Sequence, residues 1–344
     1  MKKRYAFLII TALLLDLTGC APDRISDTNL TSPSVDPTAR IVSPSAVPAE
    51  PSTPAPELQY TFDPYVLPSD ARAYLGDALS DYRHLVDAVL QRQETVSLPE
   101  DSLSKAVSCL LAEFPLSALI HDFNYDWENA SVTFSYLYDR DEHEARIQAF
   151  EKRVQQAVRA SVLPAGNDCE EAISLYRWTA QNIRYLDGGD ISVYHALMDG
   201  EGICQSYAGA YQFLLLQVGI DALGAGAFMN DGGAHEWTMV SLGGRWFHMD
   251  PTFEDSLDGG DGLTFFGMDD IRRGQSGVET PFTTGIDEWC TTAPACEDDC
   301  FRDLNACLYW ERDTAASCIR LSDGVSEEPY ADLDTDAYEI CYYQ

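Results

Sequence analysis

Apolar positions recur with helical or strand spacing through residues 60–160 of the chain. Helical spacing starts after Ser69 and again near Asp101, and the second helix must end before Pro115 because proline cannot continue a helix. The stretch ASVTFSYLY then alternates larger apolar with smaller or polar positions, which predicts a strand. Helical spacing returns directly after this strand. We therefore expect an α/β N-terminal region whose first helix carries one apolar face, formed by Tyr74, Ala78, Tyr82, Leu85 and Val89.

Two further helices are predicted in the middle of the chain. The first has Asn167 as its N-cap, with Glu170 at capping-box spacing, and ends near Ile183. The second covers about fifteen residues from Ile203, because apolar residues recur there with nearly helical period. Gly219 provides a natural C′ residue for this second helix.

A β-hairpin is predicted in the stretch HEWTMVSLGGRWFHMDPT. Two adjacent glycines suit a two-residue turn, which pairs Leu242 with Arg245. This register places His235 opposite Thr252 and makes it a diagonal neighbour of Asp250 on the same face. The proline after Asp250 keeps that residue extended and ends the strand.

The first 59 residues are predicted to be a targeting signal followed by a tether, and not to be part of the folded domain. Residues 1–19 combine MKKR with a short apolar run and end in Leu-Thr-Gly before Cys20, which resembles a lipoprotein signal peptide with lipid attached to Cys20. Residues 20–59 are rich in proline, serine and threonine, so they cannot bury enough apolar surface to fold. The sequence therefore predicts an extracytoplasmic protein, lipid-anchored to a membrane at the cell surface.

The composition excludes one class of partner. The chain carries 22 Lys and Arg against 56 Asp and Glu, for a formal net charge of −34. Nucleic-acid binding requires clustered cations, so no nucleic-acid partner is expected. Acidity of this degree suits solubility outside the cytoplasm.

The cysteines fit an oxidising compartment. With Cys20 assigned to lipid and Cys204 held apart, eight remain, an even number that allows four disulfides in 105 pairings. A zinc site in the tail is the alternative, but the tail has no CxxC pair and no nearby histidine. The eight are Cys109, Cys169, Cys290, Cys296, Cys300, Cys307, Cys318 and Cys341.

Cys204 lies where a reactive thiol would be placed. It falls in the first turn of the helix that follows a glycine loop, and free amide N–H groups there favour a thiolate. A thiolate enzyme also needs a base and a group that orients it, and the predicted hairpin supplies His235 and Asp250. His248 and His195 are weaker candidates for the base, because neither has a carboxylate as well placed.

The stretches GEGICQSYAGAYQFLLLQVGIDA, HEW and GGRWFHMDPT together resemble the core of the transglutaminase-like superfamily, relatives of papain-like thiol enzymes. The resemblance extends from Asp168 to Arg273. It implies an α+β fold in which a nucleophile helix packs on an antiparallel sheet, with the catalytic core in residues 161–275 and a Cys-rich extension in residues 276–344. It implies Cys204 as nucleophile, His235 as general base and acid, and Asp250 as the residue that orients His235. The oxyanion would be held by the amide of Cys204 and by an upstream side chain, for which Tyr194 is the candidate.

The implied chemistry is acyl transfer, which needs no metal. Our leading hypothesis is a surface-tethered hydrolase of peptide or isopeptide bonds, with cell-wall peptides or surface proteins as substrates, because many bacterial members of the superfamily look like hydrolases. A transglutaminase that uses an amine acceptor is the first alternative. The second is a non-catalytic binding lipoprotein with Cys204 in a disulfide. Calcium binding by Glu254, Asp258 and Asp261 is a further option, although their spacing matches no known calcium loop.

Overall fold

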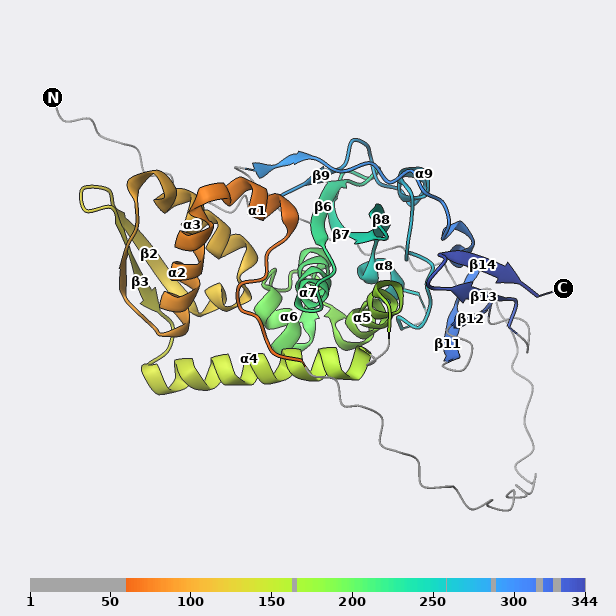
Figure 1. Ribbon diagram of the computed structural model, residues 1–344, viewed down its shortest axis with the longest axis horizontal. Coiled ribbons are helices and arrows are strands. Elements are labelled where there is room, and N and C mark those ends of the chain that lie inside the picture. Colours follow the sequence, from red (N-terminus) through yellow and green to blue (C-terminus); the bar gives the residue numbers. More distant parts are fainter. Residues whose placement is uncertain are drawn as a thin grey trace, which may run out of the picture.

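The computed structural model describes residues 60–162, 166–257, 259–285, 289–313, 318–323 and 329–343. The predicted signal peptide, Cys20 and the predicted tether lie outside the described residues. Within them the chain has an α+β fold, in which the N-terminal region, the central core and the C-terminal extension follow one another along the long axis (Figure 1). None of the helices in these ranges is both long and apolar enough to cross a membrane.

The N-terminal region combines helices with a small antiparallel sheet of order β1-β3-β2. Helix α4 then runs along one side of the molecule, beneath both this region and the core (Figure 1). Its N-cap, Asp139, accepts a hydrogen bond from the Glu142 amide. The elements are α1 (Ser69–Leu75), η1 (Gly76–Ala78), α2 (Leu79–Leu90), β1 (Thr95–Ser97), α3 (Glu100–Glu113), η2 (Pro115–Leu119), β2 (Ile120–Asp126), β3 (Ser131–Tyr136) and α4 (Arg140–Ser161).

The predictions for this region are confirmed for α3, β3 and α4, but the prediction of the first helix is wrong in one respect. The expected continuous helix after Ser69 is interrupted at Gly76, whose φ of 52° ends α1 before the chain continues through η1 into α2. Glycine adopts this backbone region at little cost, so local geometry overrides the helical spacing of the apolar residues.

The core is built on a five-stranded antiparallel sheet of order β10-β9-β6-β7-β8, with α7 packed across β6 and β7. The predicted helix ends are confirmed: the Asn167 side chain accepts from the Glu170 amide, and Gly219 has a φ of 88° just after α7. The elements are α5 (Asp168–Asn182), β4 (Arg184–Tyr185), α6 (Val193–Asp199), β5 (Glu201–Gly202), α7 (Cys204–Gln217), β6 (Ala222–Phe228), β7 (Ala234–Leu242), β8 (Arg245–Met249), α8 (Pro251–Asp255), α9 (Asp270–Gln275), β9 (Thr283–Thr284) and β10 (Thr291–Thr292).

The β7–β8 hairpin has the predicted register as far as its ladder extends. Leu242 pairs with Arg245, and the two turn glycines have positive φ values of 57° and 76°. The ladder ends at Thr238 and Met249. The expected pairing of His235 with Thr252 is therefore wrong, because the chain enters α8 at Pro251 instead of continuing as a strand.

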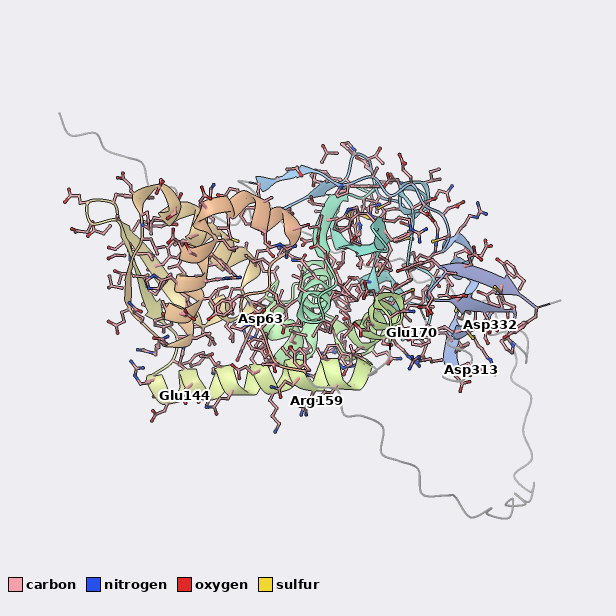
Figure 2. All side chains as sticks on the ribbon, viewed as in Figure 1. Asp63, Glu144, Arg159, Glu170, Asp313 and Asp332 are labelled. Carbon is pink, nitrogen blue, oxygen red and sulfur yellow. The ribbon has the colours of Figure 1, made fainter. Side chains whose placement is uncertain are left out.

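The C-terminal extension forms a four-stranded antiparallel sheet that the sequence did not predict, of order β11-β12-β13-β14. Arg312 attaches it to α5 through two hydrogen bonds to the Glu170 carboxylate, of 3.0 and 2.6 Å. Figure 2 shows Glu170 on α5 beside this sheet. The Glu170 side chain thus binds the C-terminal sheet, while only the backbone amide of Glu170 takes part in the helix cap. The elements are η4 (Arg302–Ala306), β11 (Tyr309–Asp313), β12 (Cys318–Ser322), β13 (Ala331–Asp334) and β14 (Glu339–Tyr342).

The expected disulfides are not formed in the described part of the chain, where all nine cysteines are free. Cys109 lies on α3 and Cys169 on α5, each within a packed interior. Cys318 and Cys341 lie on β12 and β14 with β13 between them. Strands two positions apart are about 9.5 Å from each other, beyond the reach of a disulfide.

Candidate active site

Cys204 is the first residue of α7, and a tight loop places it there. The Ser206 hydroxyl accepts a hydrogen bond from the Ile203 amide at 2.8 Å and donates one to the Asp190 carbonyl at 2.9 Å. A Cβ atom on Gly202 would come within 2.3 Å of the Ser206 Oγ atom, so only glycine fits this position of the loop. As a whole residue, Cys204 is partly exposed.

The sulfur lies against β7, where it accepts a hydrogen bond from the amide of Glu236, the residue that follows the predicted base. Burial raises the pKa of the Cys204 thiol to about 11, while hydrogen bonds from the Glu236 and Gln205 amides act in the opposite direction. The sequence-based expectation of a resting thiolate is therefore not met, because desolvation outweighs the helix N-terminus. At neutral pH the residue is a thiol, and forming the thiolate requires a base to take the proton.

His235 and Asp250 are in direct contact, as the hairpin register predicted. The His235 Nε2 atom donates to Asp250 Oδ2 at 2.7 Å, and both side chains are nearly or fully buried. The His235 ring stacks on Phe253 at 4.4 Å. Because Nε2 is bonded to the carboxylate, Nδ1 is the nitrogen that remains to face a thiol.

Asp250 is held by several groups besides His235. Its Oδ1 atom accepts the Phe253 amide at 3.1 Å and caps α8, and its Oδ2 atom also accepts Arg273 Nη1 at 2.8 Å. The Tyr176 hydroxyl donates to its backbone carbonyl at 3.1 Å. Burial by itself would raise the pKa of Asp250, but His235 and Arg273 outweigh it and lower that pKa to about 2. The carboxylate is therefore ionised throughout the physiological range.

Arg273 and Tyr176 are the two site residues that the sequence did not reveal. Arg273 comes from α9 and Tyr176 from α5, and neither follows a motif that requires its residue type. A possible signal for Arg273 was its place just after FFGMDD, where the resemblance ends. Only the folded chain shows that its guanidinium reaches Asp250.

Tyr194, the expected oxyanion residue, takes part in other contacts. It is buried, its ring stacks on Phe150 of α4 at 5.5 Å, and its hydroxyl is hydrogen-bonded with Arg146. No contact between Tyr194 and Cys204 is found among the described residues. The assignment of Tyr194 is corrected accordingly, because α6 turns this side chain toward α4.

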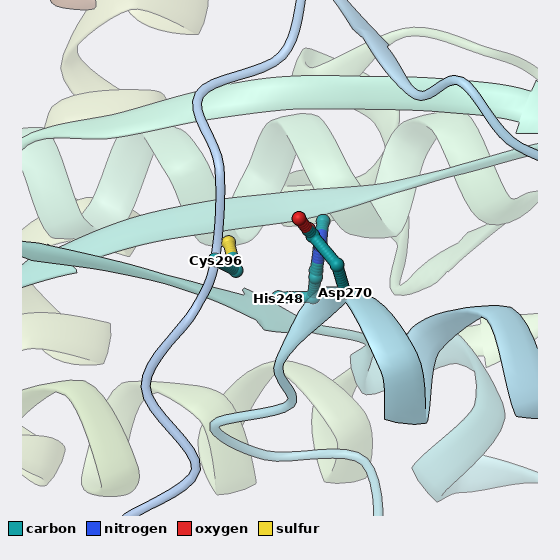
Figure 3. A group of neighbouring side chains, drawn as sticks. All are labelled: His248, Asp270 and Cys296. Atoms are coloured by element: carbon teal, nitrogen blue, oxygen red, sulfur yellow. The ribbon is translucent and has the colours of Figure 1, made fainter.

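The weaker histidine candidates also have other partners. His195 bonds through Nδ1 to Asp199 at 2.7 Å on the surface of α6. His248 lies on β8 and is fully buried, with Asp270 and Cys296 beside it (Figure 3). The ligand atoms of these last three residues lie within 4.8 Å of one another, so they have the composition of a metal site.

The hydrogen bonds of His248 argue against a metal at this cluster. The Trp237 indole can only donate, and it donates to His248 Nδ1 at 2.9 Å. The proton of the neutral ring must then sit on Nε2, which donates to Asp270 at 2.9 Å. A metal bound at Nε2 would need the opposite tautomer. We therefore interpret the cluster as a hydrogen-bonded chain that fixes Trp237 next to His235.

The described carboxylates of the acidic segment proposed to bind calcium accept hydrogen bonds from other residues of the protein. Glu254 is buried and accepts from the Tyr176 hydroxyl and from the Phe265 amide, both at 2.8 Å. Asp261 accepts from Arg177 and Gln181, both at 2.6 Å. Asp258 lies outside the described residues. The two described carboxylates thus already have protein donors.

Two further carboxyl groups contact β7 or α7, and one of them, Glu236, interacts with the candidate nucleophile. Glu236 is on β7 and Glu113 ends α3, and Gln212 of α7 donates to Glu113 at 3.0 Å. The Oε1 atoms of Gln212 and Glu236 both lie beside Gly224. Burial raises the pKa of each glutamate to about 8. Both are therefore mostly protonated at neutral pH, and Glu236 adds little negative charge beside the thiol.

These glutamates predict a stability that declines with pH. Their folded-state pKa lies above the ordinary value of 4.5, so their contribution is complete below pH 4.5 and is lost as the pH rises through about 8. We expect the Tm to fall between pH 5 and pH 9, and Glu113→Gln to flatten that fall. Thermal unfolding by circular dichroism measures it. Glu94→Gln, which changes an exposed carboxylate, is the control and should leave the slope unchanged; an unchanged slope in Glu113→Gln would contradict the assignment.

Comparison with known proteins finds a similarity in the central part of the chain. A model of the transglutaminase-like superfamily matches residues 155–251, which include Cys204, His235 and Asp250. No curated protein matches the chain.

Solved structures add only distant similarities. A proposed cysteine protease from Cytophaga hutchinsonii is 13% identical, with 39% of this chain and 65% of that chain covered and a TM-score of 0.27. A TGase is 10% identical, with 46% of this chain and 48% of that chain covered and a TM-score of 0.28. The present chain thus spans less than two thirds of either protein, and TM-scores this low support no structural argument. The match over residues 155–251 is the finding that makes this part of the chain similar to the transglutaminase-like superfamily.

Proposed function

We propose that the protein is a thiol acyl-transfer enzyme with Cys204 as nucleophile, His235 as general base and acid, and Asp250 as the residue that orients His235. The observation that carries this proposal is the 2.7 Å bond between His235 Nε2 and Asp250 Oδ2, beside a helix N-terminus that bears a partly exposed cysteine. The Glu236 amide, next to His235 in the chain, donates to the Cys204 sulfur. Nucleophile, base and orienting group thus occupy one small volume, as this chemistry requires.

In the first half of the reaction, His235 Nδ1 takes the proton of the Cys204 thiol as the sulfur attacks a substrate carbonyl. The new carbon–sulfur bond creates an oxyanion, and the free amides of the first turn of α7 are available to stabilise it. The resulting imidazolium is stabilised by Asp250, which stays ionised. It then gives its proton to the leaving amine, the carbon–nitrogen bond breaks, and a thioester remains.

In the second half, His235 removes a proton from water, and the hydroxide attacks the thioester. The carbon–sulfur bond breaks, the acid product leaves, and the proton returns to the Cys204 sulfur. An amine could replace water in this step and would give an amide. We propose hydrolysis of peptide or isopeptide bonds as the principal outcome, with cell-wall peptides or surface proteins as the substrate class.

One assay separates these outcomes. The purified protein is incubated with a glutamine-containing peptide, a branched isopeptide and a fluorescent primary amine, and the products are identified by mass spectrometry. Release of free acid in excess over the amine adduct supports the hydrolase. A dominant amine adduct would replace it with a cross-linking enzyme.

A non-catalytic role requires that Cys204 be bridged in the mature protein. Cys204 is free in the structure, which favours the enzyme. Non-reducing peptide mapping of protein secreted from its native host tests this point directly. A disulfide at Cys204 would exclude both enzymatic readings.

We also propose that the mature protein is held at the outer side of a membrane by a lipid on Cys20, with residues 20–59 as a spacer. The basis is the sequence of the first 20 residues. The full-length protein is expected in the detergent phase after Triton X-114 partition, and Cys20→Ala in the aqueous phase. Equal partition of the two proteins would contradict the anchor.

A further inference from the structure

Arg273 is a fully buried cation in contact with the site. Its side chain has no exposed surface, and its Nη1 atom lies 2.8 Å from Asp250 Oδ2. That oxygen is the one that also accepts the His235 Nε2 proton. The guanidinium and the imidazole therefore share a single carboxylate oxygen.

The rest of the guanidinium has few polar partners. The Nε and Nη2 atoms are buried and make no hydrogen bond among the described residues. The group lies instead over the Trp237 ring, at 4.3 Å, and near Phe253, at 5.2 Å. Cation–π contacts of this kind offset part of the desolvation, but a buried ion pair seldom stabilises a fold more than apolar packing would. The stability of the core alone does not explain why an arginine occupies this position.

The position of Arg273 is well defined because α9 is fixed at several points. Asp269 caps the helix, and the Asp270 amide donates to the Cys296 carbonyl at 2.9 Å. The Arg272 side chain donates to the carbonyls of Phe301 and Thr264, at 2.9 and 2.5 Å. The guanidinium of Arg273 is thus presented to Asp250 from a rigid support.

We propose that Arg273 is a positioning residue that keeps Asp250 ionised and limits how strongly Asp250 can retain a proton on His235. The inference rests on the proposed function and adds a residue to it. With Arg273 present, the carboxylate divides its charge between two cations whenever His235 is protonated. The imidazolium is therefore less favoured than in a two-residue His–Asp pair, and it returns its proton to the leaving amine more readily.

The charged and titratable groups around the His235–Asp250 pair determine the direction of the effect expected on removal of Arg273. His235 is faced by Asp250 and, across Asp250, by Arg273 on α9, while the Cys204 sulfur on α7 is bonded to the amide of the neighbouring Glu236. Behind them lie Tyr176 of α5 with Glu254 of α8, while Glu236 of β7 and His248 with Asp270 complete the neighbouring titratable groups. Arg273 is the only buried cation that bonds to Asp250 among these. Its removal takes a positive charge away from Asp250, whose Oδ2 atom then interacts with His235 alone.

The test compares Arg273→Met with Arg273→Lys and with Arg177→Met, which removes a cation that pairs with Asp261 and not with Asp250. Labelled histidine is titrated by NMR, and the His235→Gln variant assigns the His235 signal among the six histidines. We expect the His235 midpoint to rise by about one pH unit in Arg273→Met, to change little in Arg273→Lys, and to stay unchanged in Arg177→Met. Midpoints equal to that of the wild-type protein in all three variants would overturn the proposal.

The alkylation of Cys204 gives a second readout of the same quantity. The exposed Cys290 and Cys341 and the partly exposed Cys300 are first replaced by serine, so that iodoacetamide reports on Cys204. The alkylation rate of Cys204 is plotted against pH. In Arg273→Met, the rise of this rate on the acid side should occur about one pH unit higher than in the wild-type protein. Neither readout needs a substrate. If the expected change with pH is found in a protein that has no hydrolase activity, the proposed function is contradicted, whereas the role of Arg273 is still supported.

If Arg273→Met does not fold, the ion pair is tested by a double-variant cycle. Asp250→Asn leaves the Arg273 charge unpaired, and Asp250→Asn combined with Arg273→Gln removes both charges. The double variant should regain about half of the Tm lost by Asp250→Asn. A double variant that is less stable than Asp250→Asn would show that Arg273 acts only through packing, which contradicts the proposal.

Discussion

Replacing Cys204 with serine is expected to lower the acyl-transfer rate by about 10⁴-fold or more while leaving the fold intact. A serine hydroxyl is far less acidic than a thiol, and it is also a weaker nucleophile. The measurement is the burst of 4-nitrophenol released from 4-nitrophenyl acetate, followed by turnover of the most active peptide substrate.

Cys290→Ser is the matched control, because Cys290 is also accessible to solvent but lies outside the site. It should keep the wild-type burst, and both variants should keep the wild-type Tm within about two degrees. Retention of more than one per cent of the burst in Cys204→Ser would remove Cys204 from the role of nucleophile.

Asp250→Asn is expected to affect stability and activity together. The Arg273 charge would remain buried without its counter-charge, which costs about 3–5 kcal/mol of unfolding free energy. The amide would also cease to stabilise the His235 imidazolium, so the rate should fall by about 10³- to 10⁴-fold. Urea unfolding at pH 7 and the acylation burst measure the two effects.

The control for this prediction is Asp261→Asn, which removes a partly exposed carboxylate paired with Arg177. That change should cost less than about 1 kcal/mol, because solvent screens the pair. The destabilisation by Asp250→Asn also has a defined pH dependence. The Asp250 pKa is about 2 in the folded chain and 3.8 ordinarily, so its contribution is complete above pH 3.8 and is lost as the pH falls through about 2. An equal loss of stability in the two variants at pH 7 would contradict the buried ion pair.

The candidate site was accessible to sequence reasoning where short-range rules apply. The glycine loop and the helical spacing after Ile203 placed Cys204 at a helix start, and the two-glycine turn set the pairing of Leu242 with Arg245. His235 and Asp250 meet just beyond the end of this ladder. These features depend on backbone conformation within a few residues. The same rules predicted the hairpin poorly beyond its last pair, because the start of α8 at Pro251 ended the ladder early.

The ionisation state of the thiol could not be predicted in the same way. A helix N-terminus favours a thiolate, but the burial of Cys204 depends on β7 and on residues far away in the chain. Desolvation is the larger effect, and it is a property of the packed structure. Tyr194 was misassigned for a similar reason, since the direction of its side chain follows from the packing of α6 against α4.

By itself, the sequence determined the ends of the helices at Asn167 and Gly219 and the turn of the β7–β8 hairpin, and it supplied the candidates for the nucleophile, the base and the orienting carboxylate. Each of these is encoded in residues that are neighbours along the chain. Only the tertiary structure decided that Arg273 reaches Asp250, that Arg312 joins the C-terminal sheet to Glu170, and that the nine described cysteines stay apart. Those results depend on side chains from distant segments meeting in a dry interior, where charge, tautomer and distance are set by every element packed around them.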